Sequence, residues 1–430
     1  MRCIDVVEGK DFSLDKAHAE RLRDAVDRLQ AKLKPRLPLL SESGGKFKLF
    51  NVVGTVDLGS GLAIQVSPKI EAGSEWVTAI VSLLTGREGV DVAGERRAGF
   101  STNHNKLLEA VAHTYLRRLE RAYRQEGPIV LLERRGTELP FLQGKLDATR
   151  WARTALWRPH IFPVVRTEFA QDNPFTRSLV LVSDTLAHVS TDQRTRAGLH
   201  ALSRGLSAGL PRSAPPPHGI AARSLPEQWN AYKPAWSLAM AILSRTSLFG
   251  PTGSHSGVGL AIEPWPLLET LLERCLLTIE RIGKATGRDL SYQMQGEVVL
   301  LSPRGDSPQE RFAPKPDGRL FEGGRLIASF EAKYSSYDGK APKRDHVYQA
   351  VATSAASGAP IAVLVYPDLF EPQVWDVSGF SGRPALLVAV GLGLFQWHSP
   401  SESEARATRL LSFLAGLTAQ APATPLAFAA

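Results

Sequence analysis

Two acidic residues and one lysine, Asp317, Glu331 and Lys333, lie close together in a stretch that otherwise has the pattern of two strands. Carboxylate oxygens are the ligands that hard divalent cations such as Mg²⁺ take in proteins, and Mg²⁺ usually keeps waters that a substrate phosphate can displace. A lysine beside them can stabilise negative charge that develops on such a phosphate. The three residue types together predict a site for Mg²⁺ or Mn²⁺. The alternative is a hairpin whose charges simply face solvent.

The relative placement of the two acids depends on a predicted β-hairpin. Strand-like runs over 312–321 and 325–334 flank a loop with two adjacent glycines, which is a hairpin signal. A strict two-residue turn would pair Asp317 with Phe330 and turn the two carboxylates away from each other. A three-residue loop or one β-bulge would instead set Asp317 opposite Glu331. We expect this shift, because bulges are frequent beside active sites.

The order of residues along this stretch resembles the PD-(D/E)xK nuclease core. That core has a Pro-Asp pair, a short spacer, a (D/E)xK tripeptide and then a helix with a glutamine near its start. The alternation of side chains along a strand gives the first and third residues of the tripeptide the same face. In this sequence the matching residues are Pro316-Asp317, Glu331-Ala332-Lys333 and Tyr348-Gln349, the last pair in a helix that begins near Asp345.

The composition is that of an ordinary globular protein. The chain has 430 residues, 43% of them hydrophobic and 22% charged, which is enough for two or three domains with cores of their own. Having only two cysteines, Cys3 and Cys275, excludes a disulfide framework and favours a reducing compartment. The N-terminus lacks the apolar core of a signal peptide, and apolar runs such as 385–395 are too short to cross a bilayer. We therefore expect a soluble, cytoplasmic protein with no membrane partner.

Hydrophobic periodicity predicts a mixed α/β (α+β) fold in four parts. Residues 1–100 are expected to form a β-rich domain with one long helix, and residues 101–208 a middle domain of helices and strands. A Pro-rich run, GLPRSAPPPHG, marks a connector over 209–260. Residues 261–430 are expected to form a restriction-endonuclease-like domain that carries the predicted site, with its first strand over 296–302.

Individual elements are predicted from their period and length. Asp172, Asn173 and Pro174 suit the start of a helix, because Asp and Asn are good N-caps and proline is tolerated in the first turn. The other main helices are expected over 14–33, 75–84, 103–126, 233–245, 264–285 and 404–417, and buried strands over 361–367 and 384–395.

Several short motifs follow one another in order along the chain. They are PKI, HNKLLEAVAHTYLRRLERA, LQGKLDATR, EFAQDNPFTRSLV and KPDG…FEAKY…VYQ. As a set they resemble McrC, the nuclease subunit of modification-dependent McrBC restriction systems. The resemblance covers roughly residues 54–365, and an ordered succession of motifs is more specific than any one of them.

This resemblance implies a DNA endonuclease that cuts modified double-stranded DNA in defence against foreign DNA. It also implies a partner, an McrB-like hexameric AAA+ GTPase, into whose ring McrC inserts through its N-terminal part, here residues 1–100, and whose GTP hydrolysis it stimulates. The sequence contains no GxxxxGK[ST] phosphate loop, so a nucleotide-driven activity would need a second chain. The net charge of +8 favours attraction to a polyanion. Two alternatives stay open: a nuclease that acts without a motor, and a catalytically silent scaffold or regulator of an AAA+ ring.

Roles for the residues of the predicted site follow from this assignment. Asp317 and Glu331 would hold the cation, with the main-chain carbonyl of Ala332 as a further ligand. Lys333 would orient the attacking water or stabilise developing negative charge. Gln349 would position the lysine or the DNA backbone.

Three further residues lie at the margins of the predicted site. Lys343 and Arg344 precede the helix that carries the glutamine and are candidates for contacts with DNA phosphates. Glu269 sits about 100° from the centre of the apolar stripe of helix 264–285. In related nuclease folds a glutamate of this helix assists the metal, which implies the same role here. The alternative is an ordinary solvated acid on the surface of the helix.

Overall fold

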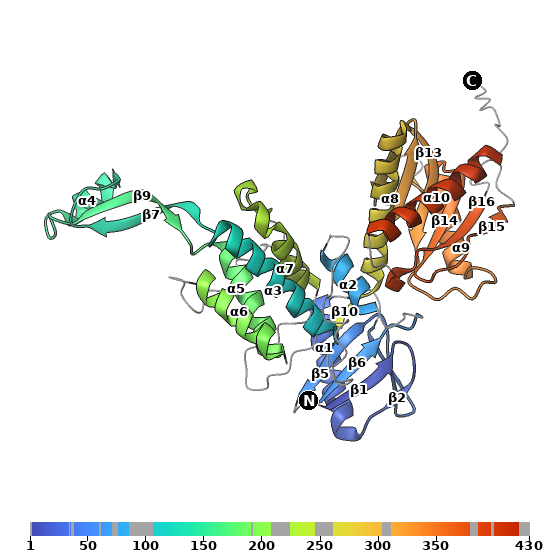
Figure 1. Cartoon of the computed structure of the whole chain (residues 1–430), viewed down its shortest axis with the longest axis horizontal. Coiled ribbons are helices and arrows are strands. Elements are labelled where there is room, and N and C mark those ends of the chain that lie inside the picture. The colour runs from blue at the N-terminus through green and yellow to red at the C-terminus, as the bar shows by residue number, and fades with distance from the viewer. Residues whose placement is uncertain are drawn as a thin grey trace. The chain divides into compact units, whose positions relative to one another are not determined.

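A computed structural model describes residues 2–33, 35, 38–59, 62–70, 76–85, 106–190, 192–207, 224–245, 261–302, 311–378, 386–396 and 400–420. The chain divides into two compact units, which are described separately (Figure 1). Unit 1 comprises Met1–Ala110 and Arg245–Ala430, and unit 2 comprises Val111–Ser244. The Pro-rich run at 209–219 and the glycine-rich loop at 250–260, both assigned to the predicted connector, lie outside the described residues.

The N-terminal part of unit 1 is β-rich, as predicted. Its main sheet has the order β1-β6-β5-β10, with β1 parallel to β6 and the other neighbours antiparallel. The helix α1 packs against β5 and contributes Leu22, Val26 and Leu29 to the core. A second small sheet has the order β2-β4-β3. The bounds are β1 Arg2–Val7, β2 Phe12–Ser13, α1 Lys16–Leu33, β3 Leu40–Ser43, β4 Lys46–Leu49, β5 Val53–Gly59, β6 Leu62–Ser67, α2 Trp76–Thr85 and β10 Ala261–Ile262.

The C-terminal part of unit 1 contains a six-stranded mixed sheet of order β11-β12-β13-β14-β16-β15. The three central strands β13, β14 and β16 run parallel, and the fully buried β14 gives the sheet its core. Helix α8 packs on β11, β12 and β13, and α10 packs on α8, whereas α9 packs on β13 and β14. The bounds are α8 Trp265–Thr286, β11 Leu290–Met294, β12 Gly318–Glu322, β13 Arg325–Ala332, α9 Arg344–Ser357, β14 Ile361–Tyr366, β15 Gln373–Asp376, β16 Leu386–Gly391, η3 Leu394–Gln396 and α10 Pro400–Gln420.

The first strand of this sheet was predicted wrongly. It was expected over 296–302, but the structure places it at Leu290–Met294, and in the predicted range only Leu301 forms an isolated bridge. The segment that faces 296–302 contains two prolines, which cannot donate to a strand ladder. Pro314, for example, serves only as an acceptor, from the Val298 amide at 2.9 Å. The same prolines explain why the first arm of the hairpin starts at Gly318 rather than at residue 312.

Unit 2 consists of helices with a three-stranded sheet of order β7-β9-β8. The sheet and the short helix α4 extend away from the helices of the unit as an arm (Figure 1). The helices share a core that includes Tyr115, whose hydroxyl donates to the carbonyl of Leu179 at 2.9 Å. The bounds are α3 Lys106–Glu126, β7 Leu131–Leu139, β8 Lys145–Leu146, α4 Ala148–Thr154, β9 Phe162–Ala170, α5 Pro174–Val189, α6 Gln193–Leu206, η2 Glu227–Tyr232 and α7 Lys233–Arg245.

None of the helices in the described part of the chain combines the length and apolar character needed to cross a bilayer. The helices predicted at 14–33, 75–84, 103–126, 233–245, 264–285 and 404–417 are all present, with ends that differ by a few residues. Cys275 lies in the buried face of α8, where burial raises the pKa of its thiol to about 12.

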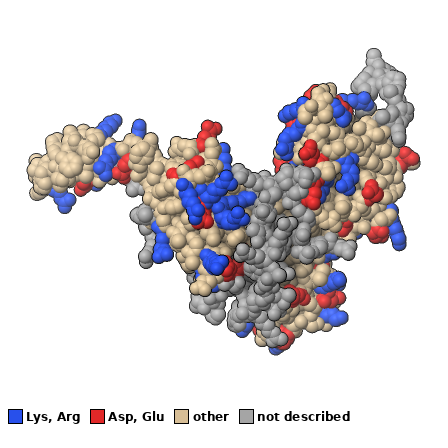
Figure 2. Space-filling model, in the orientation of Figure 1, with Lys and Arg blue, Asp and Glu red and all other residues tan. Residues whose placement is uncertain are grey.

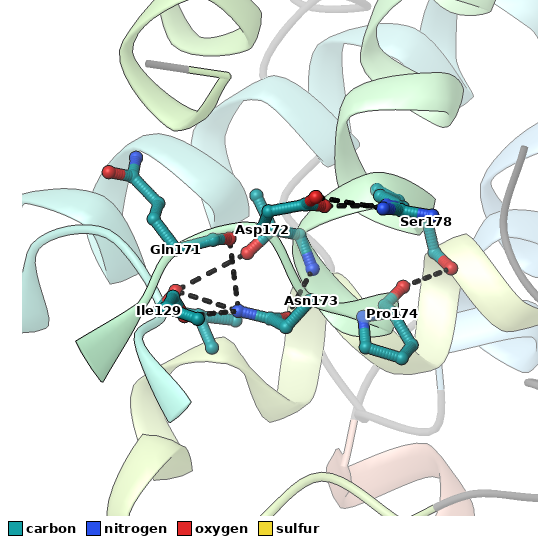
Figure 3. Close-up of polar contacts among 9 residues, drawn as sticks. Ile129, Gln171, Asp172, Asn173, Pro174 and Ser178 are labelled. Carbon is teal, nitrogen blue, oxygen red and sulfur yellow. Dashed lines mark hydrogen bonds and ion pairs between the residues drawn. The ribbon is translucent and has the colours of Figure 1, made fainter. Parts of the chain in front are cut away.

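The motif DNPF has a structural role at the junction of β9 and α5 (Figure 3). Asn173 is buried and caps α5 by accepting a hydrogen bond from the Thr176 amide at 3.0 Å. Its side-chain nitrogen donates to the carbonyls of Ile129, at 3.0 Å, and of Gln171, at 3.1 Å. One amide group therefore satisfies a backbone atom of Ile129 and two of the β9–α5 junction, which requires a donor and an acceptor on the same short side chain.

Replacing Asn173 by alanine is expected to destabilise the protein by about 2 to 4 kcal/mol, the sum of a lost cap and of buried carbonyls left without donors. Chemical denaturation followed by circular dichroism measures this loss. The matched control is Asp147→Ala, which removes an exposed N-cap of α4 and its bond to the Arg150 amide and should cost about 1 kcal/mol. Equal losses in the two variants would contradict a special role for the buried amide.

Candidate active site

The register of the β12–β13 hairpin brings the two predicted acids to the same level. The turn is a two-residue turn, with Glu322 paired to Arg325 and with Gly323 and Gly324 at φ values of 56° and 74°. Both glycines therefore adopt the left-handed conformation that this tight turn requires. A bulge beyond the turn then shifts the pairing between Leu320 and Phe321.

This bulge has the effect that was expected from the sequence. It places Gly318 opposite Phe330, so that Asp317, the next residue outward, lies level with Glu331. Without the shift Asp317 would be level with Phe330. Gly318 packs closely against α8, because a Cβ atom at this position would come within 2.8 Å of Cδ1 of Leu276, which would have to move.

Asp317 is fixed against the end of β13. Its Oδ2 accepts a hydrogen bond from the Ala332 amide at 2.7 Å. The side chain is partly buried and follows Pro316, which is buried. Asp317 therefore lies directly beside the main chain of Glu331-Ala332-Lys333. The carbonyl of Ala332 belongs to the next peptide group along the chain.

Glu331 is the most strongly perturbed acid of the site. It is only 2% exposed, and its Oε2 accepts hydrogen bonds from Gln349 Nε2 at 2.9 Å and from Lys333 Nζ at 3.3 Å. Burial raises the pKa of Glu331 to about 7; the ammonium of Lys333 opposes this shift and the charge of Asp317 adds to it. The other oxygen, Oε1, is buried and has no hydrogen-bond partner.

Lys333, Glu331 and Gln349 form a closed triangle of polar contacts. The Nζ atom of Lys333 donates to Gln349 Oε1 at 2.7 Å, while the amide nitrogen of Gln349 donates to Glu331. Lys333 and Glu331 therefore share one face of β13, as the alternation of the strand predicted. Helix α9 packs on this face and supplies the glutamine, and the polar triangle holds the lysine amine beside the buried carboxylate.

Thr353 was not identified from the sequence, and Tyr348 was named only as part of the nuclease pattern, without a role. Thr353 lies one turn beyond Gln349 on α9, is buried, and its hydroxyl lowers the pKa of Glu331. Its spacing of four residues from the glutamine is the signal that could have identified it. Tyr348 is 59% exposed and accepts a hydrogen bond from Arg344 Nε at 2.8 Å, with the guanidinium 5.2 Å from the ring centre.

The residues at the margins are placed as follows. Lys343 is exposed and occupies the N-cap position of α9, and the exposed Arg344 is the first residue of that helix. Glu269 accepts a hydrogen bond from Gln295 Nε2 at 3.2 Å. It belongs to α8, which packs on the opposite face of β13 from α9. A role for Glu269 in metal binding stays a prediction, as do DNA contacts of Lys343 and Arg344.

The donor set of the site suits a hard cation. Two carboxylates and a main-chain carbonyl provide only oxygen ligands, and one oxygen of Glu331 is buried without a hydrogen bond, an arrangement that a cation would satisfy. Across the described residues no three His, Cys, Asp or Glu side chains converge on one point. The set therefore matches an ion such as Mg²⁺ that keeps several waters, and it lacks the nitrogen and sulfur ligands of a structural zinc site.

Comparisons with known proteins concern the family and the fold of the chain. Residues 47–367 match the family model of the McrBC 5-methylcytosine restriction system component. No curated protein matches the chain. One similar chain belongs to a solved structure described as a refined half-complex from a tetradecameric assembly of Thermococcus gammatolerans McrB AAA+ hexamers with bound McrC. It matches with a TM-score of 0.63 and 18% sequence identity, and the match covers 96% of this chain and 100% of that chain.

A second structure is the cryo-EM structure of the Thermococcus gammatolerans McrBC complex, with TM-score 0.46, 16% identity, and coverage of 64% of this chain and 88% of that chain. At such identities a structural likeness concerns the fold alone, and only the first one is strong enough to support it. The family match spans most of the sequence and includes both acids and the lysine of the site. The chain therefore belongs to the McrBC 5-methylcytosine restriction system component family.

Proposed function

We propose that this protein is the Mg²⁺-dependent or Mn²⁺-dependent DNA endonuclease subunit of an McrBC-type restriction system. The observation that carries the proposal is the group formed by Asp317, Glu331, Lys333 and Gln349, with a carboxylate oxygen buried and without a hydrogen-bond partner. Membership of the restriction-system family supports the same activity. The net charge of +8 suits a DNA substrate.

The mechanism is hydrolysis of a phosphodiester bond. Asp317, Glu331 and the carbonyl of Ala332 would hold the cation, which when bound polarises the scissile phosphate and lowers the pKa of a coordinated water from 15.7 towards about 7. Lys333 places its ammonium beside Glu331, where it can donate to the attacking water or to a phosphate oxygen. Gln349 holds that ammonium in place and so reduces the number of conformations that the lysine adopts.

The surface beside the site suits the backbone of DNA. Lys343 and Arg344 lie exposed at the start of α9, one to two turns before Gln349 on the same helix. Arg344 is held by Tyr348, so its guanidinium is oriented before DNA arrives. Contacts of this type fix the position of the duplex without reading its sequence. We therefore assign Lys343, Arg344 and Tyr348 to the positioning of the scissile strand.

The arm of unit 2, residues 131–170, is the surface best suited to a protein partner. Half of the exposed large hydrophobic side chains among the described residues belong to it, seven of fourteen. On the face that Figure 2 shows, few charged side chains lie at its outer end. Exposed apolar surface of this kind usually marks a protein interaction site. The seven residues are Leu132, Phe141, Leu142, Leu156, Trp157, Val165 and Phe169.

The partner we propose for the arm is an AAA+ GTPase hexamer of the McrB type, so that the arm takes the role that the family resemblance assigns to residues 1–100. The related solved structure is described as McrB AAA+ hexamers with bound McrC, and this chain shares the fold of a chain in it. A narrow ribbon of two long strands, β7 and β9, with a small helix at its end can reach into a ring that a compact domain could not enter. Trp157 and Leu156 at that end are 84% and 86% exposed and would supply the buried anchors of the contact.

Substitution of either catalytic residue is expected to abolish cleavage. Asp317→Asn removes a cation ligand, and Lys333→Ala removes the ammonium, so each should reduce Mg²⁺-dependent cutting of double-stranded DNA by a factor on the order of 10²–10³ in the presence of the AAA+ partner and GTP. Gel assays of DNA cleavage measure the rate, and circular dichroism checks the fold. Glu322→Gln, at the other end of the same hairpin, is the control and should cleave normally, because it loses only a partly exposed ion pair with Arg288. Normal cutting by Asp317→Asn would remove the proposed site.

Glu269→Gln distinguishes the two readings of that acid. If Glu269 assists the cation, cleavage should slow by about tenfold, which is less than for Asp317→Asn because Glu269 lies on the helix at the far face of the strand. The reaction is followed over a series of Mg²⁺ concentrations, and a higher Mg²⁺ requirement is expected. A variant that matches the unsubstituted protein at every concentration would return Glu269 to the role of a surface acid.

Cation binding is expected to strengthen as the pH rises through 7. The carboxyl of Glu331 has a pKa of about 7, so it is mostly protonated at pH 6 and mostly ionised at pH 8. Because the cation competes with the proton for this oxygen, affinity for Mn²⁺ or Mg²⁺ should be about tenfold higher at pH 8 than at pH 6. Isothermal titration calorimetry measures both values. Equal affinities at the two pH values would exclude Glu331 as a titrating ligand.

Partner binding is expected to depend on the end of the arm. The double variant Leu156→Ser, Trp157→Ser should weaken binding to the AAA+ hexamer by about tenfold or more, because both side chains are exposed in the free protein and contribute nothing to its core. Analytical ultracentrifugation with the nucleotide-bound hexamer measures the affinity. Leu301→Ser truncates a comparable side chain, 62% exposed, outside the arm and should bind normally. Full affinity of the double variant would assign the contact to another surface.

A further inference from the structure

A buried carboxylate connects the N-terminal part of unit 1 to the strand that carries the proposed active site. Glu8 follows β1 and is 1% exposed. Its Oε2 accepts a hydrogen bond from the hydroxyl of Tyr334 at 2.8 Å, although the two residues are 326 positions apart in the sequence. Tyr334 is the residue directly after Lys333, so this contact ends one residue from the proposed active site.

The carboxylate is satisfied by groups from several segments. Its Oε1 accepts from the Asn51 amide at 2.9 Å, and its Oε2 also accepts from the Lys69 amide at 3.3 Å. The ammonium of Lys69 lies 3.6 Å from Oε1 and 4.7 Å from the centre of the Tyr334 ring. Glu8, Lys69 and Tyr334 therefore form one cluster, which we name the latch.

The latch is rigid for an energetic reason. A buried carboxylate is tolerated only where charge and hydrogen-bond donors compensate its lost hydration, and removing one donor leaves a costly unpaired oxygen. If Tyr334 moved away from Glu8, Oε2 would keep only the longer hydrogen bond from the Lys69 amide, at 3.3 Å. Its ring also lies under the Lys69 ammonium, an attraction that depends on the same position.

The position of Tyr334 in turn limits the position of Lys333. The Lys333 amide donates to the Val365 carbonyl at 2.8 Å, which extends the pairing of β13 with β14, and the Lys333 carbonyl accepts from the Ser335 amide at 2.8 Å in a turn. The main chain of Lys333 thus has the sheet on one side and the anchored tyrosine on the other. Among the described residues the bond from Lys333 to Val365 is the last one that pairs the chain with β14, so the side chain of Tyr334 supplies the next fixed point after Lys333.

We propose that Glu8, Lys69 and Tyr334 are positioning residues that hold Lys333 in its working geometry, so that the N-terminal part of the chain controls the alignment of the active site. The proposal rests on the function proposed above only for its effect on cleavage; the effect on the lysine itself is independent. It explains why a polar cluster with a buried charge occupies this junction, where apolar side chains of similar volume would cost less to bury.

The first test measures the reactivity of Lys333 directly. Competitive labelling of the full-length protein with an amine-reactive reagent, read by peptide mass spectrometry, reports how firmly each lysine is held. Tyr334→Phe removes only the hydroxyl and keeps the ring under Lys69, so the variant should fold, and Lys333 should label at least about threefold faster. Lys340, which is exposed, serves as the internal reference and should not change. An unchanged Lys333 rate in Tyr334→Phe would overturn the proposal.

The second test separates positioning from simple stabilisation. In single-turnover cleavage with Mg²⁺, the AAA+ partner and GTP, Tyr334→Phe and Glu8→Gln should each lower the rate about tenfold with unchanged affinity for DNA. The double variant should be no slower than the slower single variant, because both act through one hydrogen bond. Leu22→Ala, a core substitution in the same N-terminal part, lowers stability without touching the latch and should cleave at the normal rate. A cleavage rate that follows stability in all of these variants would reduce the latch to structural support.

The two proposals fail in different ways. A protein that cuts no DNA under any of these conditions would refute the nuclease assignment, and the labelling experiment would still decide the latch. A protein that cuts DNA normally with Tyr334→Phe in place, and labels normally at Lys333, would refute the latch and leave the nuclease assignment intact.

Discussion

The arrangement of the site depends on the burial of one carboxylate, Glu331. A lone ionised acid in such a place would be strongly disfavoured, and the rise of its pKa to about 7 shows how far desolvation outweighs the attraction of Lys333. The groups around it compensate on one oxygen only, since Gln349 and Lys333 both donate to Oε2. The remaining oxygen, Oε1, is buried and has no hydrogen-bond partner. This is the atom at which the proposed cation would offset the cost of burying the carboxylate.

The position of the second acid depends on one irregularity of the sheet. A regular continuation of the two-glycine turn would have set Asp317 level with Phe330, whose side chain is fully buried. One extra residue in β13 corrects this and sets Asp317 level with Glu331. The amide of Ala332 then fixes the acid by a hydrogen bond, so the bulge and this bond together set the spacing of the two carboxylates. A bulge is a small change in the backbone, but here it determines whether the two carboxylates lie at the same level of the hairpin.

Much of the fold and the core of the site could be predicted from the sequence, for physical reasons that also explain the failures. Periodicity identified the helices because their buried faces repeat, and alternation placed Glu331 and Lys333 together because the period of a strand is fixed. Residues 296–302 were wrongly predicted to be a strand because their composition is apolar. Strand pairing also depends on the hydrogen-bond donors of the facing segment, which contains Pro314 and Pro316. Thr353 was missed because a threonine within a helix has no distinctive local pattern. The contact of Glu8 with Tyr334 could not have been predicted from the sequence, since no local rule relates residues so far apart in the chain.

Some of the motifs that resemble the family stabilise the fold, and others contribute residues to the candidate site. The motif DNPF is polar, as catalytic motifs often are. The side-chain amide of Asn173, however, forms hydrogen bonds with main-chain atoms of Ile129, Gln171 and Thr176, so its role is structural. The EAKY run contains both kinds, because Glu331 and Lys333 line the site while Tyr334 donates to Glu8. Adjacent residues of one strand thus point to two different neighbourhoods, and the period of the strand separates the two roles. It follows that a motif is a reliable guide to function only when the partners of each of its side chains are known.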